Sequence, residues 1–244
     1  TATEIAYLSG VTSAIQTQLD TKGTASNVTG LSDALIKTGS IYIGNDPSST
    51  TDAAWFNVAV GTTALDAITT GDYNTSVGYQ SLKSQTIGQY NSAFGSYALT
   101  TNTTSNYNSA FGSYALNLNT TGVSNIAVGY NTLATNTIGQ YNTAVGQDAL
   151  KSNTTGSSNT ASGRYSLYFN STASYNTAYG ACTLFANTTG AYNTATGFKA
   201  LAANTCGTEN TADGNGALQN NTTGSCNTAT GYQAMRFNTT GPDN

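Results

Sequence analysis

A 17-residue unit recurs eleven times, without insertion or deletion, from residue 57 to the end of this 244-residue chain. Every copy opens with asparagine, which we number position 1, and the same spacing places glycine at position 5 and leucine at position 9. Met235 replaces leucine in the last copy and is the one exception at these three positions. A fixed period of this length is typical of a solenoid, in which each copy forms one coil stacked on the previous coil.

We interpret the three repeated positions as structural. Asparagines can hydrogen-bond side chain to side chain along a stack, glycine permits a positive φ or a close approach of two backbones, and leucine is the large residue expected inside. The asparagines include Asn57, Asn74, Asn91, Asn108, Asn125, Asn142 and Asn159, the glycines include Gly61, Gly78, Gly95 and Gly146, and the leucines include Leu65, Leu82, Leu99 and Leu150. A second asparagine ladder is expected at position 12, from Asn102 to Asn238.

The pattern within one copy predicts an all-β parallel β-solenoid, or β-roll. In the copy that starts at Asn142, the first five residues read as a short strand, residues 149–152 as a second strand, and the Asn-Thr-Thr-Gly sequence as a corner. Position 3 is always Ala or Ser and should face a cramped interior. Position 4 varies and accepts Asp213, so it should be exposed or face another chain.

The core of such a coil is narrow, because one leucine and one or two alanines bury little apolar surface per 17 residues. The residue before each asparagine is often aromatic and offers more apolar surface. We therefore expect chains to associate, with these aromatic residues at the surface or between chains: Tyr73, Tyr90, Tyr107, Tyr141, Tyr175 and Tyr192, together with Phe56.

Composition argues against several functions. The chain has no histidine, which removes histidine-based triads, bases and metal sites. Its net charge is −4 with seven scattered basic residues, so nucleic-acid binding is not expected. The apolar runs are too short to cross a bilayer. We predict no enzyme, no catalytic residue, no metal and no cofactor.

Two features leave alternatives open. Glu209 and Asp213 lie four residues apart and could form a carboxylate pair that cleaves a glycan, although variation on a solvated face is the favoured interpretation. The cysteines Cys182, Cys206 and Cys226 occupy three different positions of the repeat. An odd number without regular spacing predicts neither a disulfide framework nor a metal-ligand set. Tolerated small residues in a reducing compartment are the favoured interpretation, and a bond between chains or between adjacent coils is the alternative.

Three segments are predicted. Residues 1–39 form a linker or trimerising segment with short helices, one from Ser13 to Gly23 and one from Asp33 to Lys37. Residues 40–56 form a degenerate capping coil, since Gly44 lies 17 residues before Gly61. Residues 57–244 form the solenoid. The chain does not begin with methionine and Asn244 would open a twelfth copy, so we expect the fibre to continue beyond this sequence.

Two resemblances suggest a function. The segment TATEIAYLSGVTSAIQTQLDTK at residues 1–22 resembles a linker module of tailed-bacteriophage fibre proteins, especially those of cyanophages, and VTGLSDAL at residues 28–35 resembles another piece of the same shafts. Repeats such as YNTAVGQDAL at residues 141–150 are similar to the head repeats of trimeric autotransporter adhesins. Those heads are left-handed parallel β-rolls, three per trimer, and their usual unit is shorter than 17 residues.

The resemblances imply a homotrimeric tail fibre of a virion, assembled in the host cytoplasm and contacting other fibre or baseplate proteins. The leading hypothesis is an adhesion fibre that reaches a host surface and contacts it at many points, with a host cell-surface glycan as a candidate partner. One alternative is a pure spacer whose receptor-binding tip lies elsewhere. A less favoured alternative is an ice-binding solenoid, because threonine ladders can order water.

Overall fold

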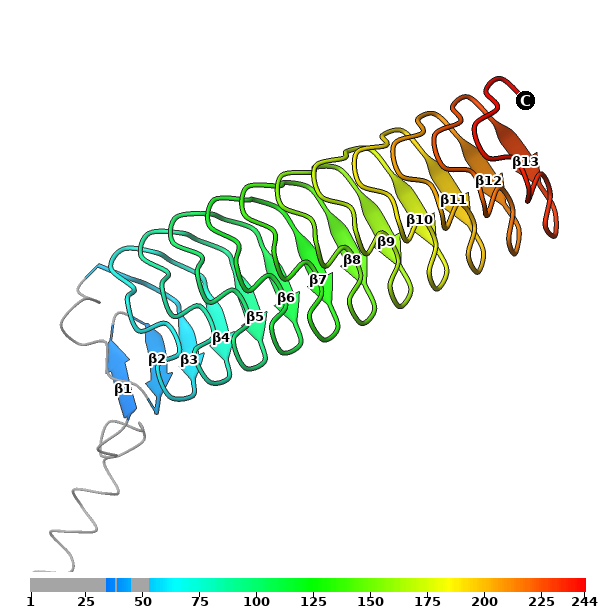
Figure 1. Cartoon of the computed structure of the whole chain (residues 1–244). Coiled ribbons are helices and arrows are strands. Elements are labelled where there is room, and N and C mark those ends of the chain that lie inside the picture. Colours follow the sequence, from blue (N-terminus) through cyan, green and yellow to red (C-terminus); the bar gives the residue numbers. More distant parts are fainter. Residues whose placement is uncertain (1–33, 38, 45–52) are drawn as a thin grey trace, which may run out of the picture.

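The computed structural model describes residues 34–37, 39–44 and 53–244, and these residues form one sheet of 13 strands ordered β1 to β13 along the chain. Figure 1 shows the coils stacked side by side into an elongated, gently curved rod. The described residues contain no helix. The predicted parallel β-solenoid of 17-residue coils is confirmed. The solenoid strands after β2 are β3 (Val58–Val60), β4 (Thr75–Val77), β5 (Ser92–Phe94), β6 (Ser109–Phe111), β7 (Ile126–Val128), β8 (Thr143–Val145), β9 (Thr160–Ser162), β10 (Thr177–Tyr179), β11 (Thr194–Thr196), β12 (Thr211–Asp213) and β13 (Thr228–Thr230).

Each coil contains one three-residue strand, at positions 2 to 4, so the predicted second strand at residues 149–152 is wrong. The reason is backbone geometry. Asp148 has a φ of 57° and Leu150 a φ of 50°, and such left-handed residues turn the chain instead of extending it. Pairing with neighbouring coils nevertheless continues here, because the Leu150 amide donates to the Ser166 carbonyl at 2.9 Å and the Ser152 amide to the Tyr168 carbonyl at 3.1 Å.

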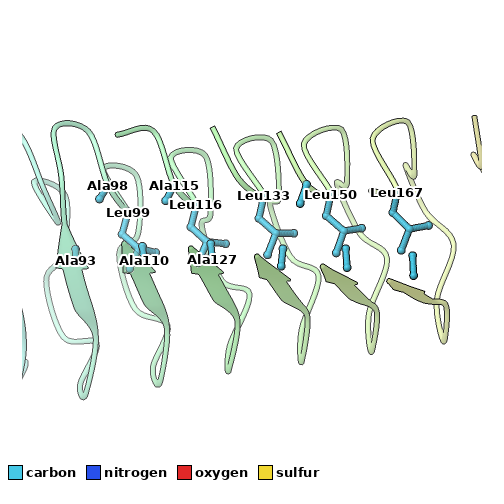
Figure 2. Packing of buried hydrophobic residues seen from close by; sticks show 14 of the residues in the cluster. Ala93, Ala98, Leu99, Ala110, Ala115, Leu116, Ala127, Leu133, Leu150 and Leu167 are labelled. Atoms are coloured by element: carbon cyan, nitrogen blue, oxygen red, sulfur yellow. The ribbon is translucent and has the colours of Figure 1, made fainter. Parts of the chain in front are cut away.

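The core is a single file of leucines and alanines. Figure 2 shows the leucine side chains pointing toward the strands, where they meet the alanines of position 3. Leu99, Leu116 and Leu133 are fully buried, as are Ala93 and Ala110. The narrow core predicted from the sequence is therefore confirmed, and so is the interior placement of position 3.

Two constraints require glycine at position 5: a positive φ and the close approach of the next coil's backbone. Gly146 has a φ of 125°, a region that side chains rarely occupy, and a Cβ built on it would lie 2.8 Å from the carbonyl carbon of Gly163 in the next coil. Both effects that the sequence predicts for this position are therefore present. The coils can stack at strand spacing only because neither glycine carries a side chain.

Both asparagine ladders are present, and they are fully buried from Asn57 to Asn227 at position 1 and from Asn102 to Asn221 at position 12. At position 1, the Asn142 Nδ2 donates to Asn125 Oδ1 at 3.1 Å, and at position 12 the Asn153 Nδ2 donates to Asn136 Oδ1 at 2.8 Å. Each coil's two ladders meet at one backbone atom, since Asn142 Nδ2 and Asn153 Nδ2 both donate to the carbonyl of Gly156 at 2.9 Å. The ladders therefore fix the corner of the coil as well as the stack.

The start of the rod differs from the predicted helix. Residues predicted as the helix from Asp33 to Lys37 include β1 (Ala34–Lys37), which pairs antiparallel with β2 (Ser40–Ile43) across a turn in which Gly39 has a φ of 75°. A helix of five residues cannot offset the cost of its nucleation, whereas the hairpin gives these residues a partner strand. The predicted helix from Ser13 to Gly23 lies outside the described residues.

β2 belongs to the solenoid. It pairs parallel with β3 in the 17-residue register, with Ile41 opposite Val58, and Gly44 has a φ of 79°. Ser40 Oγ also accepts a hydrogen bond from the Asn57 amide at 2.8 Å, which is the role of the preceding asparagine in the later coils. The repeat therefore extends one coil toward the N-terminus, with serine in place of asparagine.

Candidate functional site

Position 17 carries a column of aromatic residues along the outside of the rod. Stacked neighbours lie one coil apart, with ring-centroid distances of 5.1 Å for Phe56–Tyr73, 4.9 Å for Tyr73–Tyr90 and 5.3 Å for Tyr90–Tyr107. The last two pairs are within 7° of parallel. We call this row the aromatic column; its rings are Phe56, Tyr73, Tyr90, Tyr107, Tyr141, Tyr175 and Tyr192.

The aromatic column is held by the backbone at positive φ. Every residue at position 17 from Phe56 to Asp243 has a φ between 55° and 62°. From Tyr73 onward the amide of each also donates to the previous coil, as when the Tyr141 amide donates to the Val123 carbonyl at 3.1 Å. Because the backbone repeats, each side chain leaves the rod at the same place, and rings in successive coils stack.

Two serines interrupt the aromatic column, at Ser124 and Ser158. They flank Tyr141, so no ring occupies position 17 in the coil before it or the coil after it. A second stack follows, in which Tyr175 and Tyr192 lie 5.1 Å apart and 3° from parallel. The column predicted from the sequence thus forms two stacks with one isolated tyrosine between them.

The outward face of the strands changes character along the rod. In β3 to β8 this face carries large apolar side chains that are 36% to 43% exposed in the single chain: Val58, Val60, Phe94, Phe111, Ile126, Val128 and Val145. In β11 and β13 the same positions are threonines. We call the row of apolar side chains on β3 to β8 the apolar strip. The prediction that position 4 is at least partly exposed is confirmed.

A cluster of aromatic side chains that sequence analysis did not single out lies on the turns that follow β9 and β10. Tyr168 stacks on Phe185 with centroids 5.5 Å apart, and Phe169 meets Phe185 edge-on at 5.1 Å. Tyr165 lies 5.5 Å from Tyr168, and the Arg164 guanidinium carbon is 4.4 Å from the Tyr165 ring centroid. The available signal was the run of aromatic residues at positions 10 and 11, which are small or polar in most other coils.

Glu209, Asp213 and the three cysteines lie in the later coils. Asp213 lies on the outward face of β12, whereas Glu209 belongs to position 17 and its Oε2 accepts a hydrogen bond from Cys226 Sγ at 3.7 Å. Desolvation, followed by the carboxylates of Glu209 and Asp243, raises the pKa of the Cys226 thiol. A raised pKa lowers the fraction of reactive thiolate near neutral pH. All three cysteines are free.

The threonines of position 13 use their hydroxyl protons within the rod. Thr137 Oγ1 donates to the Thr154 carbonyl at 3.0 Å, and Thr154 Oγ1 donates to the Ser171 carbonyl at 3.0 Å. The threonine row at position 14 is interrupted by Ile87, Ile138 and Cys206. Positions 13 and 14 of the described coils therefore do not form two uninterrupted rows of free threonine hydroxyls.

Within the residues that the structure describes, no group of three histidine, cysteine, aspartate or glutamate side chains could hold a metal ion. The same residues include no helix long and apolar enough to cross a membrane. Comparison with models of known protein families, with curated proteins and with solved structures found no match.

Proposed function

We propose that this chain is part of a virion fibre, a bacteriophage tail-fibre region that reaches toward a host cell and attaches to its surface through many weak contacts. The observation that carries the proposal is the repetition of one coil geometry along an elongated rod. Each coil presents the same outward positions, one coil rise of about 4.8 Å from the next. A row of equivalent contacts increases avidity without any strong single site.

The bacteriophage part of the proposal depends on the resemblance of residues 1–22 and 28–35 to fibre linkers. Residues 1–33 lie outside the described part of the chain, so the support from the structure is the rod itself. From β2 to β13 the stack extends roughly 50 Å at the usual strand spacing. Seven basic and eleven acidic residues in 244 leave a surface dominated by amide, hydroxyl and aromatic groups. These are groups that contact neutral polar surfaces.

The proposal includes a homotrimer. We assign the contact between chains to the apolar strip, because a continuous row of partly exposed Val, Ile and Phe is stabilised by burial against a partner. The aromatic column is a weaker choice, since its rings already stack on one another within the chain. Burial of the apolar strip between chains would also add a core shared by the three chains to the narrow core of each coil.

Two measurements on the intact chain test the proposal. Light scattering should give three times the chain mass of 25.0 kDa. The purified particle, labelled with a fluorophore, should bind cells of a cyanobacterial panel and release when the surface polysaccharide is stripped. A measured mass of one chain would show that the protein is not a homotrimer. A trimer that binds no cell surface supports the spacer alternative instead.

A further inference from the structure

We propose that the two interruptions of the aromatic column are binding slots, each for one neutral pyranose ring at the end of a glycan. One slot lies between Tyr107 and Tyr141 over Ser124, and the other between Tyr141 and Tyr175 over Ser158. This inference rests on the proposed function, because it names the chemical group that an adhesion fibre would recognise. It adds a site of defined size on the surface of the rod.

The size of each slot follows from the regularity of the backbone. Ser124 and Ser158 have φ values of 57° and 58°, against 57° for Tyr141 between them, so the chain path does not change where the ring is missing. Elsewhere in the column one ring occupies each coil, at 4.9 to 5.3 Å from the next. A coil without its ring therefore leaves room for one guest ring.

The tyrosine rings beside the slots are more exposed than those inside a stack. Tyr73 and Tyr90, which have ring neighbours on both sides, are 47% and 45% exposed. Tyr107, Tyr141 and Tyr175 are 58%, 61% and 56% exposed. The difference corresponds to ring faces that no side chain covers. Bare aromatic faces with a fixed spacing form a platform for the apolar face of another ring.

The floor of each slot is polar and uncharged. Ser124 and Ser158 are half-buried, and among the described residues their hydroxyls form no hydrogen bond, while their amides already donate to the carbonyls of Asn106 at 3.2 Å and Gln140 at 2.9 Å. The position 16 side chains beside the slots are Val123, Gln140, Ser157 and Ser174, none of them charged. A free hydroxyl group without a nearby charge suits a neutral ligand.

A pyranose ring matches this arrangement better than a purely aromatic guest. Its two faces carry C–H groups that pack on tyrosine rings, and its edge carries hydroxyls that can exchange hydrogen bonds with serine and with the tyrosine hydroxyls. An aromatic hydrocarbon ring would leave the serine hydroxyl without a partner. A uronic or sialic acid would bring a negative charge to a site with no cation.

The slot geometry also predicts which sugar of a glycan enters. Tyrosines close the slot on both sides along the rod and serine closes it from behind. A glycan chain that runs along the rod therefore cannot pass through the slot. A terminal residue or a one-residue branch enters without its neighbouring sugars meeting the walls, and we expect it to be the guest. The two slots lie two coils apart, about 9.6 Å, so neighbouring glycan ends can occupy both.

Filling the slots tests the proposal without disrupting the rod. The double variant Ser124→Tyr with Ser158→Tyr supplies the missing rings at positions where tyrosine is the most frequent residue, so we expect it to fold with an unchanged or higher thermal midpoint. The matched control is Ser96→Tyr with Ser113→Tyr. These two serines occupy position 6, where Tyr79, Tyr130 and Tyr232 already occur. A third variant, Tyr141→Ala, removes the wall that both slots share.

The readout is binding to an array of neutral and acidic glycans, with cell binding measured in parallel. We expect the wild type and the control to bind neutral glycans by their terminal sugar. The filled variant and Tyr141→Ala should lose about tenfold or more in binding, since the first fills every slot of the particle and the second removes the wall that both slots share. Undiminished binding by the filled variant overturns the slots. Cell binding without neutral-glycan binding also overturns them but leaves the fibre function intact. Absence of both cell and glycan binding is the failure of the proposed function itself.

Discussion

Asn142, like most of the position-1 asparagines, uses every side-chain hydrogen-bonding group that it has. Asn142 Nδ2 donates to Asn125 Oδ1 and to the Gly156 carbonyl, and Asn142 Oδ1 accepts from the amide and the Nδ2 of Asn159 at 3.0 and 3.1 Å. Only a primary amide can donate twice and accept twice in this plane. This requirement explains why the position never varies among the eleven repeats.

The variant Asn142→Asp should therefore be strongly destabilising. It removes both donors and buries a carboxylate without a cation, so we expect the free energy of unfolding to fall by about 3 kcal/mol or more at pH 7. Burial raises the pKa of such a carboxyl group, so part of the loss should be recovered as the pH falls and the group is protonated. Urea denaturation at pH 7 and near pH 4 measures both effects. The exposed Asn215→Asp is the control and should change stability little; an equal loss in the control contradicts the argument.

The core leucines occupy a backbone region that penalises branching at Cβ. Position 9 has a φ between 47° and 55°, and its residues are leucine or methionine in every coil, never valine or isoleucine. We expect Leu150→Val to cost about 2–4 kcal/mol, from backbone strain and a small cavity, whereas Leu150→Met should cost less than about 1.5 kcal/mol. Denaturant unfolding of the two variants checks this, and equal costs would show that side-chain volume alone matters.

The sequence indicates these left-handed positions by the near absence of β-branched residues. Hydrophobic alternation does not use this signal. Positions 9 and 17 never hold a β-branched residue, and position 7 does so once, at Thr63. Burial, the glycine corner and both asparagine ladders could be predicted, because they depend on residue chemistry in a stack. The second strand could not, because alternation over residues 149–152 says nothing about φ.

At the scale of the coil, hydrogen bonds connect each unit only to its two neighbours. The register is in phase throughout, for example Thr143 opposite Thr160 and Thr160 opposite Thr177. Such a stack has interchangeable units, because every coil presents the same donors, acceptors and core residues to the next. Sequence analysis could predict this from the period alone. It could not predict the hairpin of β1 and β2, since the pairing of Leu35 with Tyr42 depends on the edge that the first coil exposes.

Deletion of one complete unit should be tolerated. Removing residues 142–158 brings the copy at Asn159 onto the copy at Asn125 with all 17 positions in phase, so we expect a folded rod with a slightly lower urea midpoint. Removing residues 142–157 leaves one extra residue, which misplaces the asparagine, glycine and leucine rows and should abolish cooperative unfolding of the distal coils. Circular dichroism with urea titration separates the two. If both deletions behave alike, register does not control the stack.

At the scale of the whole molecule, the scarcity of charge makes stability depend little on ion pairs. One ion pair is present among the described residues, from Lys151 Nζ to Asp148 Oδ1 at 3.2 Å. Hydrogen bonds along the rod and the leucine file replace electrostatic contacts. The shape of the molecule could be read from its period. The bare ring faces of the aromatic column could not, because they become visible only when the backbone is known to be identical at Ser124 and Ser158.

Alkaline pH should weaken the rod at its first coil. Burial, and to a smaller extent the charge of Asp72, raises the pKa of Tyr42 above its usual value of 10.0. The unfolded chain therefore loses this proton first, so the stabilisation is complete below about pH 10 and declines as the pH rises through the folded pKa. Thermal unfolding measured between pH 8 and 11.5 checks the decline. In the variant Tyr42→Phe the thermal midpoint should fall less steeply with rising pH. If it falls as steeply as in the wild type, other groups cause the decline.

The hydrogen bonds between coils run along the length of the rod, so a pull on its two ends loads them directly. One coil occupies about 4.8 Å of the rod, but its 17 residues span up to about 58 Å when extended. Each coil that detaches from the stack can therefore extend to about twelve times its own rise along the rod. Because neighbouring coils are nearly equivalent, they would yield one at a time at similar forces, and the rod would absorb a sudden load as a series of short extensions while its ends stay joined.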